Sequence, residues 1–168
     1  VIEVISGKEY REFLKEEFFI PLEMIDTDFY VPEEKWERFA KVYEYFEEEP
    51  KLRTYQGYNL AIMRQNRLPG FQSGGAGLVS TLDDYLHFDT MILNNGVYKG
   101  NRILSKESID FMRTNHLNEE QLKSYDWEDL KGYGYGTFVR VLKDKELANT
   151  PGRIGEFGWG GWAGTESI

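Results

Sequence analysis

The sequence predicts an α+β protein, in which helices occupy most of the chain and an antiparallel hairpin follows near the carboxyl end. Hydrophobic residues recur at helical spacing in four segments between residues 8 and 112. Hydroxyl residues that can cap a helix precede two of these segments. Alternating residues then run over 132–142, and a polar, turn-rich connection leads to a glycine-rich stretch over 155–165. Helices followed by paired strands are typical of the α+β class.

Length and composition indicate a folded protein with its own hydrophobic core. The chain has 168 residues, a hydrophobic fraction of 40% and an aromatic fraction of 15%. Its net charge of -9 argues against a nucleic-acid partner, whose phosphates attract a basic surface. Cysteine is absent, which excludes a disulfide framework, a thiolate nucleophile and a cysteine zinc site in this sequence. No apolar run approaches the roughly 20 residues that span a bilayer, so we expect no membrane segment.

Both ends of the sequence look cut. The chain begins with Val1 inside an apolar run, and it stops at Ile168 inside a strand pattern. We therefore expect the natural beginning to lie upstream, and localisation cannot be read from this end. A truncated sheet would expose an unpaired edge and apolar faces, which makes self-association plausible.

The first part of the chain contains two predicted helices. Residues 1–5 form a short apolar run that fits either a strand or a helix, because periodicity does not distinguish the two. From Lys8 the pattern is helical as far as Pro21, and Pro32 suits the first turn of the next helix. The residues expected to face inward are Tyr10, Phe13, Leu14, Phe18, Trp36, Phe39 and Ala40.

Two short segments beyond these helices have an ambiguous pattern. Residues 42–46 could extend the second helix or form a strand, and residues 52–55 could return as a second strand. A run of glutamates followed by Pro50 separates the two segments, and such a run is typical of a solvated turn.

Capping residues mark the next two helices. Ser80 and Thr81 precede a helix with Asp83 and Asp84 in its first turn, where hydroxyls satisfy free amides and carboxylates complement the helix dipole. Both aspartates are therefore predicted to be structural. Ser105 is predicted to cap the following helix. The apolar positions expected on the two helices are Leu82, Tyr85, Leu86, Phe88, Met91, Ile109, Phe111 and Met112.

The sequence contains two histidines, His87 and His116, which fall in different elements. No third ligand lies at metal spacing from them, so we expect no catalytic metal. His87 is predicted on a helix surface, and His116 at a helix end, where it satisfies carbonyl groups. The charged stretch 117–131 is predicted to be a surface loop with Trp127 turned inward.

The stretch Gly155–Thr165 has an unusual composition, with five glycines and three aromatic residues among its eleven. Glycine weakens a strand, so a run of it marks a place where a ligand or another backbone comes close. Trp159 and Trp162 could then wall a pocket. The alternative is a glycine-rich hairpin whose two tryptophans belong to the core, and composition alone does not decide between the two.

We find no activated nucleophile in the sequence. There is no Gly-x-Ser-x-Gly elbow, and none of the serines has a lysine three residues later. The segment Ser73–Gly77 is rich in glycine and precedes a helix, an arrangement that could cradle a phosphate. It lacks the Gly-Lys-Ser/Thr ending of a P-loop and any basic residue, so this interpretation is weak.

Five motifs follow one another along the chain: PLEMIDTDF (21–29), SGGAGLVSTLDDYLHF (73–88), RILSKESIDFMRTNHL (102–117), GYGYG (132–136) and GWGGWAGT (158–165). Together they resemble the later part of a serine β-lactamase-like protein. This superfamily includes class C β-lactamases, D-alanyl-D-alanine peptidases and β-lactamase-like carboxylesterases. The resemblance covers nearly the whole chain and implies a fragment of the β-lactamase/transpeptidase-like fold, in which an antiparallel sheet packs beside a mostly helical region. We therefore expect residues 1–168 to be a single partial domain.

The resemblance implies an active site built from three motifs. The nucleophilic serine and base lysine of Ser-x-x-Lys, and the tyrosine of Tyr-x-Asn, would lie upstream of Val1. The third motif, Lys/His-Thr/Ser-Gly on a strand beside the site, falls on Trp159, Gly160 and Gly161. By the same resemblance, these three residues would bind substrate, and the backbone amide of Trp162 would donate to the oxyanion.

Trp-Gly-Gly departs from the β-lactamase pattern, because it lacks the charge and the hydroxyl that recognise a carboxylate. Similar versions occur among the carboxylesterases of the superfamily, so the resemblance favours a small-molecule ester or amide over a β-lactam or a D-alanyl peptide. It implies acyl transfer through a covalent acyl-enzyme, with no cofactor. The 168 residues alone are expected to be inactive.

Two other functions fit the same residues. A catalytically dead relative would use the cleft as a ligand-binding module and would lack Ser-x-x-Lys upstream. An unrelated module with aromatic walls would bind sugars or peptides through Trp159 and Trp162. In that case the tryptophans would line an open groove far from any helical partner.

Overall fold

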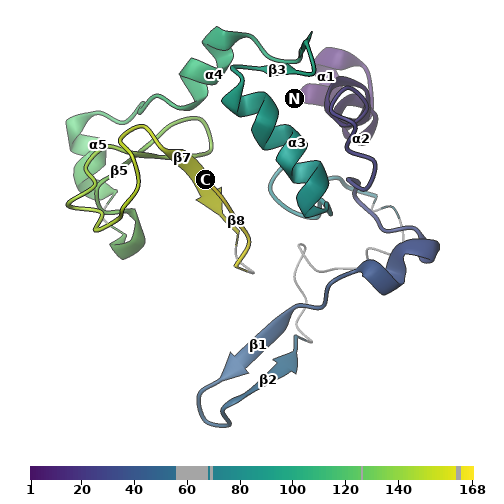
Figure 1. Ribbon diagram of the computed structural model, residues 1–168, viewed down its shortest axis with the longest axis horizontal. Coiled ribbons are helices and arrows are strands. Elements are labelled where there is room, and N and C mark those ends of the chain that lie inside the picture. The colour runs from purple at the N-terminus through teal and green to yellow at the C-terminus, as the bar shows by residue number, and fades with distance from the viewer. Residues whose placement is uncertain (56–67, 69, 126, 162–163) are drawn as a thin grey trace. The chain divides into compact units, whose positions relative to one another are not determined.

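The computed structural model describes residues 1–55, 68, 70–125, 127–161 and 164–168. The chain forms two compact units, Val1–Ile103 and Leu104–Ile168, and each is described by itself. Helices and short antiparallel strands occur in both units (Figure 1).

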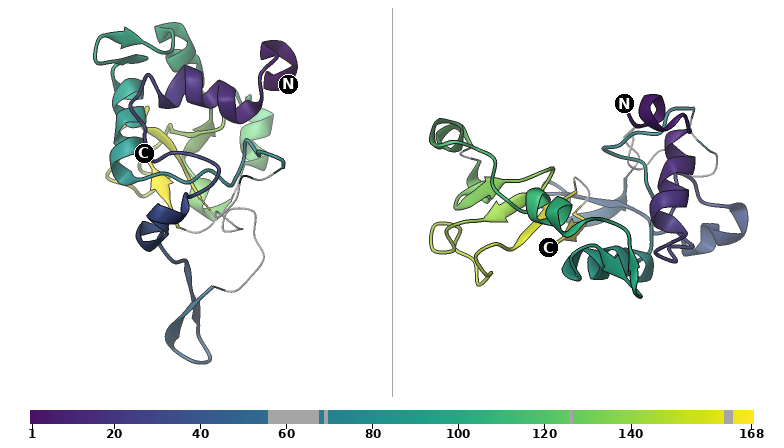
Figure 2. Two further views of the ribbon diagram at one scale, coloured as in Figure 1. Left: turned by 90° about the vertical axis from the view of Figure 1, so that its right-hand side faces the viewer. Right: turned by 90° about the horizontal axis from the view of Figure 1, so that it is seen from above.

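The first unit begins with helices, which decides between the two interpretations of residues 1–5. Helix α1 spans Ile2–Ser6 and ends at Gly7, whose φ of 71° is a left-handed conformation that glycine adopts without strain. Helix α2 spans Tyr10–Leu14 and continues into the π-helical turn η1, Lys15–Phe19. Figure 2 shows α2 and η1 as one uninterrupted helix, which confirms the helix predicted from the pattern between Lys8 and Pro21.

The second predicted helix is a 3-10 helix, η2, over Glu33–Arg38, and Pro32 directly precedes it. The ambiguous segments that follow are strands: β1 spans Tyr43–Phe46, β2 spans Lys51–Thr54, and the two pair antiparallel. Our expectation that the apolar side chains of η2 face inward is wrong. The short 3-10 helix buries none of its residues, and those left exposed beside or within it are Trp36, Phe39 and Ala40.

Helix α3, Leu82–Leu93, begins as predicted at Thr81, whose hydroxyl accepts a hydrogen bond from the Asp84 amide at 3.2 Å. Strands β3, Val97–Tyr98, and β4, Asn101–Arg102, form a hairpin directly after it. Three of the apolar positions named for this helix are exposed, because the loop before α3 and strand β3 cover only one side of the helix. The exposed positions are Leu82, Tyr85 and Leu86. The buried hydrophobic residues of this unit are Phe19, Leu22, Met24, Phe29, Val31, Met91, Ile92 and Tyr98.

The second unit opens with three short helical elements. Helix α4 spans Lys106–Met112 and is capped by Ser105 as predicted, although Phe111 on it is exposed. Helix α5, Glu119–Ser124, and the 3-10 turn η3, Glu128–Leu130, lie where we expected only a loop. Asn118 and Gln121 form a capping box at the start of α5, a local signal that the sequence analysis missed.

The prediction that Trp127 is turned inward is also wrong. Trp127 is exposed, and Leu130, three residues further along the chain, is buried in its place. Trp127 is the residue that precedes the 3-10 turn η3, and the buried residue of that turn is Leu130.

A four-stranded antiparallel sheet with the order β5-β6-β7-β8 forms the rest of the second unit. Its strands are β5, Tyr133–Tyr135; β6, Arg140–Leu142; β7, Phe157–Gly160; and β8, Glu166–Ser167. The predicted hairpin between residues 132–142 and 155–165 is confirmed by the pairing of β6 with β7. The single strand expected over 132–142 is instead two strands, because the chain turns between Gly136 and Val139.

Candidate functional site

The candidate substrate-binding residues lie at the end of strand β7. Trp159 and Gly160 are its last two residues, opposite Ser167 and Glu166 of β8, and Gly161 follows directly. The Gly161 amide donates to the Thr165 carbonyl oxygen at 2.6 Å, just beyond the pairing of the two strands. The proposed oxyanion donor, Trp162, lies outside the described residues.

Trp159 is partly exposed, with 39% of its surface accessible, so it is not sealed inside a core. The Tyr135 ring of strand β5 meets it edge to face, with ring centroids 5.6 Å apart and an interplanar angle of 81°. Tyr135 in turn lies 5.9 Å from the ring of Tyr125. Trp159 is therefore held by another ring and largely covered, while its accessible 39% can contact a ligand.

The glycines of strand β7 have different roles. Gly158 is buried, and a Cβ atom there would overlap the Ser167 carbonyl oxygen of strand β8. Gly160 is exposed, and a Cβ atom there would meet no other atom within 4 Å. Packing thus explains the glycine at 158, whereas the surface above Gly160 is open to an incoming molecule.

Strand β7 pairs with different neighbours along its length. Phe157 and Gly158 pair with β6, whereas Trp159 and Gly160 pair with β8. In the part of the chain that the structure describes, the last two residues of β7 therefore have a strand partner on one side alone. Backbone groups on the other side can hydrogen-bond a ligand.

The charges near this strand cancel. Arg140 on β6 forms an ion pair with Glu166 on β8, and the Arg140 guanidinium also lies 4.9 Å from the centroid of the Tyr133 ring. The Arg140 side chain is only 16% exposed, so its positive charge faces Glu166 more than water. A neutral ligand matches such a strand better than an anion does.

Both histidines have structural surroundings. His116 Nε2 lies 2.9 Å from the carbonyl oxygen of Phe111 in the last turn of α4, which confirms its predicted role at a helix end. His87 is half-buried, not on the surface as predicted, because the Tyr98 ring of strand β3 packs against its ring, tilted by 41° with the ring centroids 5.2 Å apart. No group of three His, Cys, Asp or Glu side chains that could hold a metal ion occurs among the described residues.

Asp84 is buried and structural, as predicted. One of its carboxylate oxygens, Oδ2, accepts hydrogen bonds from the Asp26 amide at 2.7 Å and from the Thr27 hydroxyl at 2.8 Å. It therefore fixes the loop before η2 to the start of α3. Asp83, its neighbour in the first turn, is exposed.

The glycine-rich segment Ser73–Gly77 does not lead directly into a helix. Residues 78–81 separate it from α3, and the free amide of Asp84 at the helix start is already satisfied by Thr81. Val79 in this connection pairs with Asp28 through two backbone hydrogen bonds. The segment therefore lacks the helix terminus that a phosphate cradle requires.

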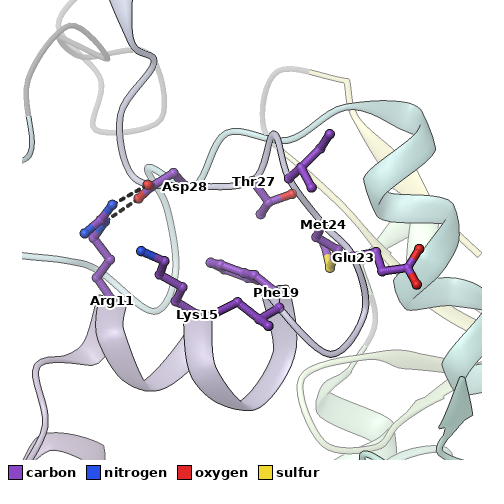
Figure 3. Close-up of a pocket in the computed structure, with 9 residues that line it drawn as sticks. Arg11, Lys15, Phe19, Glu23, Met24, Thr27 and Asp28 are labelled. Atoms are coloured by element: carbon purple, nitrogen blue, oxygen red, sulfur yellow. Dashed lines mark hydrogen bonds and ion pairs between the residues drawn. The ribbon is translucent and has the colours of Figure 1, made fainter. Parts of the chain in front are cut away.

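A cavity of about 480 Å³ lies in the first unit, between the α2–η1 helix and the loop that follows it (Figure 3). Arg11 and Asp28 close one side with two hydrogen bonds, Nε to Oδ1 and Nη2 to Oδ2, each 2.6 Å long. The hydrogen bonds to the Asp28 carboxylate raise the pKa of Arg11 above its ordinary value. This pair was not predicted, because nothing in the local sequence pattern links Arg11 to Asp28.

We assign no ligand to this cavity. Its one part-buried cation is already neutralised by Asp28, so the pair holds the loop to the helix. A second cavity, of about 440 Å³, lies in the second unit beside Leu130 and Tyr133. The linings of both cavities leave out Trp159, Gly160 and Gly161. All three residues are exposed.

Comparison with known proteins identifies the family. The family model described as Beta-lactamase matches residues 1–167. The chain belongs to the beta-lactamase family. Protein Rv1367c of Mycobacterium tuberculosis is 33% identical to it over 173 residues, which cover 98% of this chain and 41% of the relative. The chain thus spans about two fifths of the length of the curated relatives it matches.

Two solved structures have the same fold as this beta-lactamase family chain. EstCE1, described as a hydrolase with promiscuous acyltransferase activity, superposes with a TM-score of 0.69 at 24% identity, over 95% of this chain and 42% of EstCE1. The octameric penicillin-binding protein homologue from Pyrococcus abyssi superposes with a TM-score of 0.58 at 25% identity, over 85% of this chain and 27% of the homologue.

These matches confirm the predicted family and the α+β fold class. The mixture of helices and antiparallel strands is that of the β-lactamase/transpeptidase-like fold, of which the chain covers a part. Of the helices that the structure describes, none has the length and apolar character needed to cross a membrane.

Proposed function

We propose that the chain is part of a serine hydrolase that acts on a neutral ester or amide through an acyl-enzyme. Residues 1–168 would belong to one domain, with the serine and lysine of Ser-x-x-Lys and the tyrosine of Tyr-x-Asn supplied by residues before Val1. The serine oxygen would attack the carbonyl carbon of the substrate, the alcohol or amine would leave, and water would release the acyl group.

The observation that carries this proposal is the open end of strand β7. Trp159 is partly exposed, nothing lies above Gly160, and strand pairing on the β6 side ends before both residues. A substrate could lie along Trp159, Gly160 and Gly161. The backbone amide of Trp162, next in the chain, would donate one hydrogen bond to the oxyanion, a contribution that is large in acyl transfer.

The charges around strand β7 favour a neutral substrate. Trp-Gly-Gly supplies no cation or hydroxyl, and Arg140 is engaged by Glu166. A carboxylate such as that of a β-lactam would therefore find no free positive charge on strands β6 to β8 of the described chain. The acyltransferase activity described for EstCE1 and the octameric assembly described for the Pyrococcus homologue are consistent with acyl transfer and with self-association here.

The experiment uses the protein encoded by the complete reading frame. We expect it to hydrolyse 4-nitrophenyl acetate faster than the chromogenic β-lactam nitrocefin, and a fluorophosphonate probe to label one serine and abolish the activity. The 168 residues alone should neither hydrolyse the ester nor take up the probe.

Two results would contradict the proposal. Ester hydrolysis by the isolated 168 residues that the fluorophosphonate abolishes would place a nucleophile within this sequence. A complete protein that is not labelled and hydrolyses neither compound would favour the catalytically dead relative that binds a ligand in the same place.

A further inference from the structure

Phe138 occupies an unfavourable position in the second unit. It lies in the turn between strands β5 and β6, and 82% of its surface is exposed. Its φ of 61° is in the left-handed region, which is a genuine outlier for a bulky aromatic residue. Exposing the ring to water and holding the backbone at a positive φ both cost free energy in the folded state. The packing of this unit compensates for neither cost.

The turn is held in this conformation by its neighbours. The Gly136 amide donates to the Val139 carbonyl oxygen at 2.8 Å, and the Thr137 amide donates to the Met112 carbonyl oxygen at 2.9 Å. A Cβ atom at Gly136 would overlap that same Met112 oxygen, so the chain is closely packed just before Phe138. The turn therefore presents the Phe138 ring in a defined place.

The turn adjoins the open end of strand β7. Arg140, the first residue of β6, pairs with Gly158, and Val141 pairs with Phe157. Because the two strands are antiparallel, the turn that holds Phe138, two residues before Arg140, enters β6 at the end of the sheet where β7 continues to Trp159 and Gly160. The exposed ring thus belongs to the same end of the sheet as Trp159 and Tyr135, which are in edge-to-face contact.

We propose that Phe138 contacts the substrate and gives the enzyme a preference for esters with a long alkyl or aromatic acyl group. This inference rests on the proposed function and names the substrate class for the same site. An apolar acyl group laid between Phe138 and Trp159 would cover both exposed rings, and it needs no charged partner. Strained residues that surrounding structure holds in place occur preferentially at ligand sites.

Two substitutions in the complete protein distinguish the contribution of the Phe138 ring from that of its backbone conformation. Phe138→Gly removes the ring and adopts the same φ without strain, so folding is not impaired. Phe138→Leu keeps an apolar side chain of similar reach. Phe71, which is 79% exposed in the first unit, serves as a matched control through Phe71→Ala.

We expect Phe138→Gly to lower kcat/KM for 4-nitrophenyl octanoate about tenfold, the effect of losing a few apolar contacts in a binding site, and to change kcat/KM for 4-nitrophenyl acetate less than twofold. The melting temperature should not fall. Phe138→Leu should stay within threefold of wild type for octanoate, and Phe71→Ala should leave both esters unchanged. An equal loss for both esters, or no loss for octanoate, would overturn the inference.

A binding measurement separates this inference from the proposed function. The ether 4-nitrophenyl octyl ether cannot be cleaved by acyl transfer, and its nitrophenyl group quenches tryptophan fluorescence. We expect Phe138→Gly to weaken its binding about tenfold, even if the wild-type protein proves to hydrolyse no ester. Unchanged binding would refute the role of Phe138, whereas weaker binding without any hydrolysis would refute only the proposed reaction.

Discussion

Arg140 on strand β6 and Glu166 on strand β8 form an ion pair across strand β7. Arg140 is opposite Gly158, and Glu166 is opposite Gly160, so the two residues in register between them have no side chains. The ion pair links strands β6 and β8, which flank strand β7 and its candidate substrate-binding residues.

A double-mutant cycle should detect this ion pair. With Arg140→Gln and Glu166→Gln, we expect a coupling energy of about 0.5–1 kcal/mol in the free energy of unfolding, because Arg140 is largely buried and Glu166 is half exposed. The measurement is urea unfolding of the four proteins. The ion pair of Lys131 and Glu128, both exposed, is the control and should give a coupling close to zero. Equal couplings for the two pairs would contradict this interpretation.

Alanine should have opposite consequences at two glycines of strand β7. Gly158→Ala places a methyl group against the Ser167 carbonyl oxygen, so strand β8 must move and stability should fall by about 1–3 kcal/mol. Gly160→Ala meets no atom within 4 Å and should change stability by less than about 0.5 kcal/mol. Thermal unfolding distinguishes the two. Equal destabilisation would mean that Gly160 is packed and not open.

The hydrogen bonds of Asp84 should contribute strongly to stability. Asp84→Ala leaves the Asp26 amide and the buried Thr27 hydroxyl without their acceptor, which should cost about 1–3 kcal/mol. Asp83→Ala is the matched control, since Asp83 is an exposed carboxylate of the same helical turn. Calorimetry of both variants tests the prediction. A larger loss for Asp83→Ala would overturn it.

The ion pairs of Asp26 should make the stability of the first unit fall at acidic pH. Hydrogen bonds from Lys35 and Arg38 lower the pKa of Asp26 below its ordinary value of 3.8. A carboxyl whose pKa is lower in the folded state stabilises the fold above about pH 4, and this contribution is lost as the pH falls through the folded-state pKa. Asp26→Asn should therefore be less stable than wild type at pH 7, and the difference should shrink at pH 3.

Urea unfolding at the two pH values measures this difference. The double variant Lys35→Met with Arg38→Gln keeps the carboxyl but removes both cations, so it should show the same reduced pH dependence. If Asp26→Asn lost the same amount of stability at pH 7 and pH 3, the ion pairs would not be the source of the acid sensitivity.

Much of the candidate site could be predicted from local sequence. The glycines and aromatic residues of 155–165 mark strand β7 and its turn, and the alternation over 132–142 predicts the strand that pairs with it. Capping by Thr81 and Ser105 was also predictable, because a cap is formed between residues three apart. Each of these signals lies within a few residues of the structure it specifies.

By itself the sequence determined the family, the fold class, the helix starts and the strand that carries Trp159, Gly160 and Gly161. Tertiary structure alone decided the turn at Phe138, the exposure of α3, and the pairs formed by Arg140 with Glu166 and by Arg11 with Asp28. The reason is physical. Caps and periodic patterns are encoded by neighbouring residues, whereas burial and ion pairing depend on which distant segments the folded chain brings together.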